Sequence, residues 1–152
     1  MSRFLLPGGF ASLAVCVAVG ATRAGPSDDD TKAIQGAWVV TDHKPESEPK
    51  AVYVKAVFKG DKLTLYSELA GKNNEIECTF KLDATVTPKR IDFAPVTGAN
   101  KGQTYSGLYE FKGGELRICY RGPRSTRPKD FNDEGDGKFA TTFLVLKRKP
   151  GA

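Results

Sequence analysis

The chain has 152 residues, of which 39% are hydrophobic and 10% aromatic, enough for a single domain with a buried core. Its 16 glycines and 9 prolines favour many turns over long helices. The formal net charge is +5, and it falls to +3 (21 basic and 18 acidic residues) when the two arginines of the first 24 residues are left out. An excess this small argues against nucleic acid as a partner.

Residues 1–24 have the pattern of a signal peptide. An early arginine precedes the apolar stretch 4–19, and small residues at the end allow cleavage after Ala21 or Ala24. The uninterrupted apolar part is shorter than the ~20 residues that a membrane-spanning helix needs, so a permanent anchor is disfavoured. Lipoprotein processing at Cys16 is disfavoured by the valine before it. We therefore expect an exported protein, periplasmic or extracellular, with no stable membrane anchor.

The mature chain is expected to begin with an acidic linker over 25–33, with at most a short helical turn over 28–35. A barrel domain is expected over 34–149, because apolar and polar residues alternate there with the period of two that is typical of β-strands. The predicted strands cover 37–43, 51–58, 62–69, 75–83, 90–96, 103–112, 115–121 and 138–149.

Turn residues and alternation refine this prediction. Gly60–Asp61 suits a tight hairpin turn, and Gly113–Gly114 supplies the positive φ angles of a two-residue turn. In the strand 51–58, strict alternation places Val52, Val54, Ala56 and Phe58 on one face. In the last strand, odd and even positions are equally apolar, so alternation does not decide which of its two faces points inward.

Consecutive antiparallel strands with short connections leave two edges that must be covered, and an up-and-down barrel closes them. The predicted fold class is therefore all-β, a small antiparallel up-and-down barrel of about eight strands. A barrel of this size is either filled by its side chains or holds one small ligand.

A series of segments carries a resemblance to a known family. They are IQGAWVV (34–40), FKGDKLTL (58–65), TFKLDATVTPKRIDF (79–93), NKGQTYSGLYEF (100–111), ELRICY (115–120), RPKDF (127–131) and FLVLKRK (143–149). In this order they resemble the uncharacterised lipocalin-like domain of exported planctomycete proteins, over nearly all of the expected mature chain. The resemblance implies a lipocalin-like fold and export, and it implies no particular chemistry.

One motif also resembles lipocalins in general. In the GxW motif of their first strand, the tryptophan closes one end of the barrel and packs against a basic residue of the last strand. Trp38 matches that tryptophan, and Arg148 or Lys147 matches the basic residue. The chain departs from the planctomycete pattern at Gly114–Glu115, a turn variant, and in the arginine-rich turn after residue 120, which bears on what the rim binds.

Residues suited to catalysis are sparse. His43 is the only histidine, and no GxSxG motif accompanies it, which argues against a Ser-His-Asp triad. Glu75 and Glu77 alternate on the polar face of a strand, where solvation is the ordinary explanation. No glycine-rich phosphate loop opens a helix. We expect no enzymatic activity and no cofactor.

Metal and disulfide chemistry are also disfavoured. Alternation places Cys78 and Cys119 on opposite faces of their strands, out of reach of a disulfide unless a bulge intervenes. Neither cysteine has zinc-ligand spacing around it. The loop 130–138 is acidic like a calcium loop, but it lacks the terminal bidentate glutamate and flanking helices. We expect no metal site, and leave the pairing of the cysteines open.

Two candidate binding sites remain. The first is the barrel interior, a lining of inward-facing aromatic residues that suits a small apolar ligand: Trp38, Phe58, Phe80, Phe93, Tyr109, Phe111 and Tyr120. The second is a basic rim that suits an anion or an anionic envelope component: Arg117, Arg121, Arg124, Arg127 and Lys129. The sequence thus predicts a binding module for a small apolar or anionic ligand. The alternative is a protein-interaction or hydrolase-inhibitor module of the cell envelope that acts through its rim loops.

Overall fold

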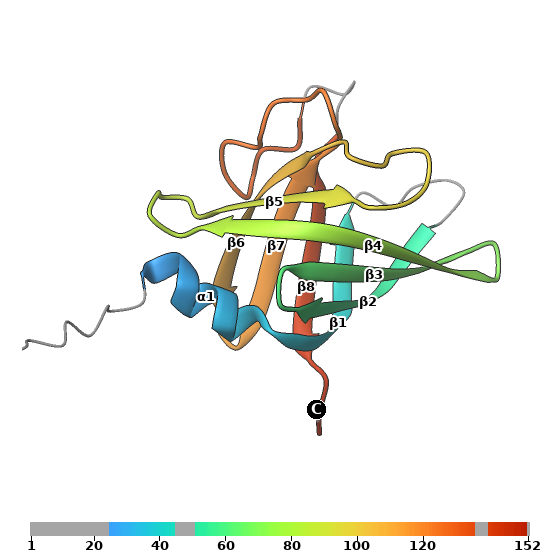
Figure 1. The fold of residues 1–152 in the computed structure, drawn as a ribbon, viewed down its shortest axis with the longest axis horizontal. Coiled ribbons are helices and arrows are strands. Elements are labelled where there is room, and N and C mark those ends of the chain that lie inside the picture. The colour runs from blue at the N-terminus through green and yellow to red at the C-terminus, as the bar shows by residue number, and fades with distance from the viewer. Residues whose placement is uncertain (1–24, 45–50, 136–139, 152) are drawn as a thin grey trace, which may run out of the picture.

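The computed structural model describes residues 25–44, 51–135 and 140–151. The expected signal peptide over 1–24 lies outside the described residues. One helix precedes eight strands (Figure 1). They are α1 (Pro26–Ile34), β1 (Gly36–Lys44), β2 (Ala51–Lys59), β3 (Lys62–Leu69), β4 (Lys72–Asp83), β5 (Arg90–Pro95), β6 (Tyr105–Lys112), β7 (Glu115–Arg121) and β8 (Thr142–Arg148). Over the described ranges, no helix is both long and apolar enough to cross a membrane.

The strands form a closed antiparallel barrel, as predicted. Each strand pairs with its neighbours in sequence, and β8 returns to pair with β1. The barrel has two unlike ends. The closed end holds α1 and the tight β2–β3 and β6–β7 turns, whereas the open end holds the longer connections after β5 and β7 (Figure 1). The fold is that of a lipocalin-like up-and-down barrel.

The residues expected to form an acidic linker instead form α1. Pro26 occupies the first turn, where its missing N–H removes no helical hydrogen bond. The Asp28 carboxylate accepts a hydrogen bond from the Gly25 N–H at 3.2 Å, and Asp28 and Asp29 complement the positive end of the helix dipole. At the other end Ile34 is fully buried. A helix this short leaves no period-two pattern in the sequence, so the alternation of apolar and polar residues could not reveal it.

Trp38 seals the closed end. Its indole Nε1 donates to the Ile34 carbonyl at 2.7 Å, and the Arg148 guanidinium lies 4.5 Å from the centre of its ring. Arg148 Nη1 also donates to the Gln35 carbonyl at 2.8 Å. The expected contact between the first-strand tryptophan and a basic residue of the last strand is thus confirmed, with Arg148 as the partner. Gln35 in turn exchanges two hydrogen bonds with the backbone of Gly60, at 2.7 and 3.0 Å.

A second tether joins α1 to the barrel. The Tyr109 hydroxyl donates to the Asp30 carboxylate at 2.6 Å, and Lys89 Nζ lies 2.7 Å from the same carboxylate. Burial, and then the hydrogen bond to Asp30, raise the pKa of Tyr109 far above its usual value. Tyr109 therefore stays a hydrogen-bond donor at any ordinary pH, and its buried hydroxyl is satisfied.

Two strands differ from the alternation expected of them. A bulge between Tyr53 and Lys55 shifts the register of β2, so that Val52 and Val54 are 45% and 40% exposed rather than inward. In β8, Leu144 and Leu146 are the buried residues, which settles the face that the sequence left open. The structure also begins β4 at Lys72 and β8 at Thr142; part of the expected 138–149 strand lies outside the described residues.

Candidate functional site

Most of the aromatic residues predicted to line the interior fill it. Trp38, Phe58, Phe80 and Tyr109 are buried, and the rings of Phe58 and Phe80 pack edge to face with centroids 5.1 Å apart. Phe111 departs from the prediction because it is 37% exposed. It lies at the margin of the closed end, with its ring 6.3 Å from Trp38 and 6.0 Å from Tyr109. Trp38, Phe58, Phe80 and Tyr109 belong to the close-packed core, and Phe111 lies outside it.

A pocket of about 180 Å³ remains at the open end; we call it the open-end pocket. Of the predicted interior residues, Phe93 and Tyr120 line it. Its other walls include Tyr53, Leu65, Ile76, Cys78, Pro95 and Tyr105, together with residues 97–100 of the β5–β6 connection. Drug-sized ligands need pockets of about 300 Å³ or more, whereas about 150 Å³ holds one benzene ring. The open-end pocket is thus the size of a single substituted ring.

Two of these residues, Tyr53 and Tyr105, were missed by the sequence analysis. Tyr53 faces the pocket because of the bulge in β2; strict alternation would turn it outward. No sequence signal marks that bulge. Tyr105, in contrast, lies four residues before the buried Tyr109 on the same strand, so alternation would have found it.

Aromatic contacts hold the pocket residues in place. Phe93 stacks on Tyr105 with ring centroids 5.3 Å apart and meets Tyr120 edge to face at 4.9 Å. The Tyr120 hydroxyl donates to the Tyr53 hydroxyl at 3.2 Å. Burial raises the pKa of Tyr120 well above its usual value and that of Cys78 to about 11. The pocket therefore presents neutral phenol and thiol groups, with no thiolate at neutral pH.

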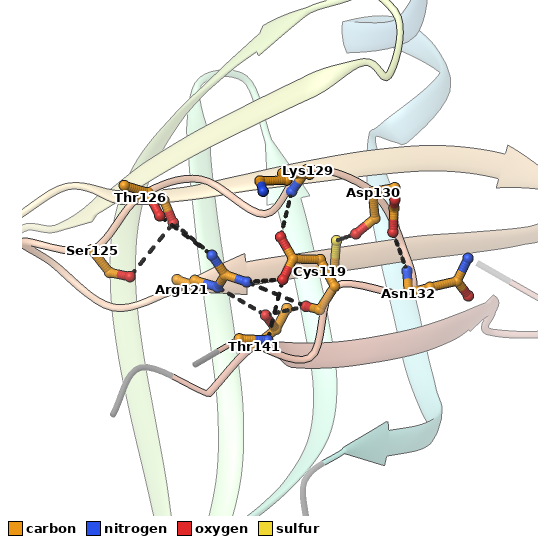
Figure 2. Close-up of polar contacts among 10 residues, drawn as sticks. Cys119, Arg121, Ser125, Thr126, Lys129, Asp130, Asn132 and Thr141 are labelled. Carbon is orange, nitrogen blue, oxygen red and sulfur yellow. Dashed lines mark hydrogen bonds and ion pairs between the residues drawn. The ribbon is translucent and has the colours of Figure 1, made fainter. Parts of the chain in front are cut away.

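The β7–β8 connection covers part of the outer wall of the barrel (Figure 2). Leu108 and Cys119 pair across β6 and β7 on the outer face, yet both are buried, because residues 122–135 fold over them. The Cys119 thiol lies 4.0 Å from the Asp130 carbonyl oxygen. Figure 2 draws this contact as a dashed line. We call residues 122–135 the outer cover. Its interior is a second, small packed cluster outside the barrel.

Arg121 anchors the outer cover. The prediction that it is an exposed rim residue was therefore wrong. It points outward as expected from alternation, but it is only 7% exposed because the cover encloses it. Its Nε donates to Thr141 Oγ1 at 2.9 Å, and its guanidinium forms a close ion pair with Asp133 (Figure 2). Asp133 also accepts from the Lys129 backbone N–H at 2.8 Å, a contact that lowers the pKa of this carboxyl.

The other predicted rim cations divide into two groups. Arg127 Nη1 donates to the Gly107 carbonyl at 2.6 Å, and its Nη2 pairs with Asp92 at 2.8 Å. Arg117 pairs with two glutamates of β6 and β7, at 3.2 and 3.7 Å. Arg124 and Lys129 are exposed and form no ion pair within the part of the chain that the structure describes. The basic rim is therefore mostly satisfied by the protein itself.

Arg124 occupies an unusual backbone conformation. The Ser125 N–H donates to the Gly122 carbonyl at 3.3 Å, closing a turn with Pro123 and Arg124 at its centre. Arg124 has φ +67°, the position of such a turn at which glycine is usual. An arginine there is strained by about 1 kcal/mol or more.

The remaining candidates stay apart from one another. Cys78 lies in the core and Cys119 under the outer cover, and both are free thiols, as alternation predicted. Burial raises the pKa of Cys119 to about 12. The His43 ring meets the edge of Tyr53 at 5.8 Å. Among the described residues, no group of three acidic, histidine or cysteine side chains is placed to hold a metal; residues 136–138 of the acidic loop lie outside them.

The two glutamates weighed as an acid–base pair also lie on the surface. Glu75 and Glu77 are both exposed on β4. The Glu75 carboxylate accepts a hydrogen bond from Tyr66 at 3.4 Å. Both side chains are open to water, which favours a solvated surface role.

The geometry defines a lipocalin-like barrel with one sealed end and a small aromatic pocket at the other end. A scan against protein-family models, a search of curated proteins and a search of solved structures each found no match for this chain.

Proposed function

We propose that the protein is an exported, non-catalytic binding module that holds one small ligand in the open-end pocket. The observation that carries this proposal is the contrast along the barrel axis. The closed end is filled and sealed, whereas about 180 Å³ stays unfilled beside Tyr53, Phe93 and Tyr120. Protein interiors are close-packed and contain few spaces larger than a water molecule, so an unfilled pocket beside a filled core is a candidate binding site.

Export rests on the sequence. The signal-peptide pattern of residues 1–24 supports it, as does the resemblance to the lipocalin-like domain of exported planctomycete proteins. The absence of a catalytic role is supported by the surroundings of the candidate groups. His43 contacts an aromatic ring, and Glu75 and Glu77 are exposed on β4.

Native mass spectrometry of the protein isolated from its own host tests the proposal. We expect a mass above that of the polypeptide, lost on denaturation, which identifies the ligand. Ile76→Trp replaces an aliphatic side chain of the pocket wall by a larger, aromatic one, so a smaller fraction of this variant should carry the added mass. The exposed Val52→Trp on the same barrel is the matched control and should retain it. The bare polypeptide mass for every form, or equal retention by both variants, would contradict the proposal.

A second candidate function is protein interaction through the outer cover. The strained, exposed Arg124 favours it, because strain in a backbone persists where the side chain has a use. Deleting the whole turn would also remove the structural contacts of Arg127, so a point variant is the better test. Under this proposal, Arg124→Ser weakens capture of an acidic envelope protein and added salt weakens capture by the wild type. Capture that neither change affects would rule it out.

A further inference from the structure

In the open-end pocket, a hydrogen bond between two tyrosine hydroxyls leaves one O–H group free to donate. The Tyr120 hydroxyl donates its proton to the Tyr53 hydroxyl at 3.2 Å. Each phenol carries a single O–H donor. Because the Tyr53 oxygen already accepts, its own O–H is left to donate, and no acceptor for it lies among the described residues.

Tyr105 adds a second hydroxyl on the neighbouring wall of the pocket. Asn100, in the loop that borders the pocket, limits the rise in the pKa of Tyr105 that burial causes. The Tyr105 O–H likewise has no acceptor within the described ranges of the chain. The pocket thus presents two phenol donors, from Tyr53 and Tyr105, beside a stacked aromatic surface formed with Phe93.

The charge of the pocket lining limits what these donors can bind. No lysine, arginine, aspartate or glutamate lines the pocket. A buried carboxylate or ammonium group would therefore lose its hydration without gaining a counter-charge, which is costly. A neutral carbonyl or ether oxygen can accept from a phenol without that penalty.

From these three observations we infer that the ligand class of the open-end pocket is a neutral ring-containing molecule with an oxygen acceptor, held by the hydroxyls of Tyr53 and Tyr105. The inference rests on the proposed function and sharpens it. It favours the small apolar ligand over the anionic one for this site. The aromatic walls supply most of the binding free energy, and the phenols select for the oxygen.

Two commercial probes of similar shape test the inference. Acetophenone carries a ring and a carbonyl oxygen, whereas ethylbenzene has the same ring and no acceptor. We expect the purified protein to bind acetophenone about fivefold more tightly than ethylbenzene in an NMR titration, the usual net effect of one hydrogen bond. The double variant Tyr53→Phe with Tyr105→Phe keeps both rings, so it should bind the two probes equally. Tyr66→Phe, on the outer wall, is the matched control and should keep the wild-type ratio.

The outcomes separate this inference from the proposed function. Saturable binding of both probes with equal affinity by the wild type overturns the inference and leaves a binding pocket in place. A preference that survives the double variant also overturns it, because the acceptor is then recognised elsewhere. Failure of both probes to bind at all contradicts the proposed function itself.

Discussion

The two ends of this barrel treat the polar groups of their aromatic side chains differently. At the closed end each polar atom of an aromatic side chain has a partner: the Trp38 indole donates to Ile34, and the Tyr109 hydroxyl donates to Asp30. At the open end the Tyr53 hydroxyl accepts from Tyr120, and neither Tyr53 nor Tyr105 donates to a group among the described residues. Satisfied groups stabilise a fold, whereas unsatisfied ones beside a cavity are available to a ligand.

This contrast separates stability from binding along one axis. Substitutions at the closed end should lower the free energy of unfolding and leave probe selectivity unchanged. Conservative substitutions of the open-end tyrosines should do the reverse. A variant that changed both properties together would break the comparison.

Removal of the closed-end seal should have the largest effect. Trp38→Ala deletes a buried ring, its hydrogen bond to Ile34 and its stacking with Arg148. We expect a loss of about 4 kcal/mol in the free energy of unfolding, measured by urea denaturation followed by circular dichroism. Val39→Ala, at the exposed neighbour, should change it by less than about 0.5 kcal/mol. Equal effects from the two would mean that Trp38 does not seal the barrel.

The second tether of α1 should have a smaller effect. Asp30→Ala leaves the buried Tyr109 hydroxyl without its acceptor, so we expect a loss of about 2 kcal/mol in the free energy of unfolding. In the Tyr109→Phe background the later removal of Asp30 should cost less, because only its ion pair with Lys89 remains to be lost; a double-mutant cycle measures the difference. Asp29→Ala, exposed on the same helix, is the matched control. An additive cycle would show that the two residues do not interact.

The outer cover offers a test of its own through its cysteine. Asp133→Ala removes the carboxylate that pairs with Arg121, so the cover should open more often and Cys119 should react faster with a thiol reagent at pH 8. Cys78, inside the barrel, is the internal control and should keep its rate. Mass spectrometry of the labelled peptides measures both. Equal acceleration of both thiols would indicate global unfolding instead.

Low pH should also open the outer cover, because it protonates the Asp133 carboxylate. The folded-state pKa of Asp133 lies below its usual value near 3.8, mainly because the Lys129 N–H donates to it. A carboxyl with a lowered pKa contributes stability that is complete above its unfolded value and is lost as the pH falls through the folded value. Cys119 protection in the wild type should therefore weaken below pH 4, whereas Asp133→Ala should lack this step.

The smallest expected effect is a gain. Arg124→Gly relieves the positive φ angle at the centre of the turn, so the free energy of unfolding should rise by about 1 kcal/mol. Arg124→Ala removes the same charge and keeps the strain, so it should leave stability unchanged. A gain in both variants would point to charge repulsion instead of backbone strain.

Much of this architecture follows from alternation and turn residues. Alternation and turn residues predicted the eight strands, the two tight turns and the opposite faces of Cys78 and Cys119. The contact of Trp38 with Arg148 or Lys147 was instead implied by the resemblance to lipocalins, and the structure shows Arg148 as the partner. The pocket could not be predicted. It depends on the bulge that turns Tyr53 inward, and a one-residue bulge reverses every side-chain direction beyond it without marking the sequence.

The basic rim shows the second limit of alternation. The pattern placed Arg121 on the outer face correctly, yet it carries no information about which loop later covers that face. Arg121 and Arg127 are held by contacts to residues 12 and 20 or more positions away in sequence. Such long-range contacts come from tertiary packing, which local patterns do not encode.

We propose that the barrel binds a ligand at its open end while its closed end stays sealed. An acetophenone titration followed by two-dimensional NMR tests it directly, because Trp38 is the single tryptophan and gives one indole signal at the closed end. We expect saturable chemical-shift changes for the amides of Gly98 and Ala99, which border the pocket, and no change for the Trp38 indole. A saturable shift of the Trp38 indole as large as those of Gly98 and Ala99, or no saturable shift at either end, would contradict it.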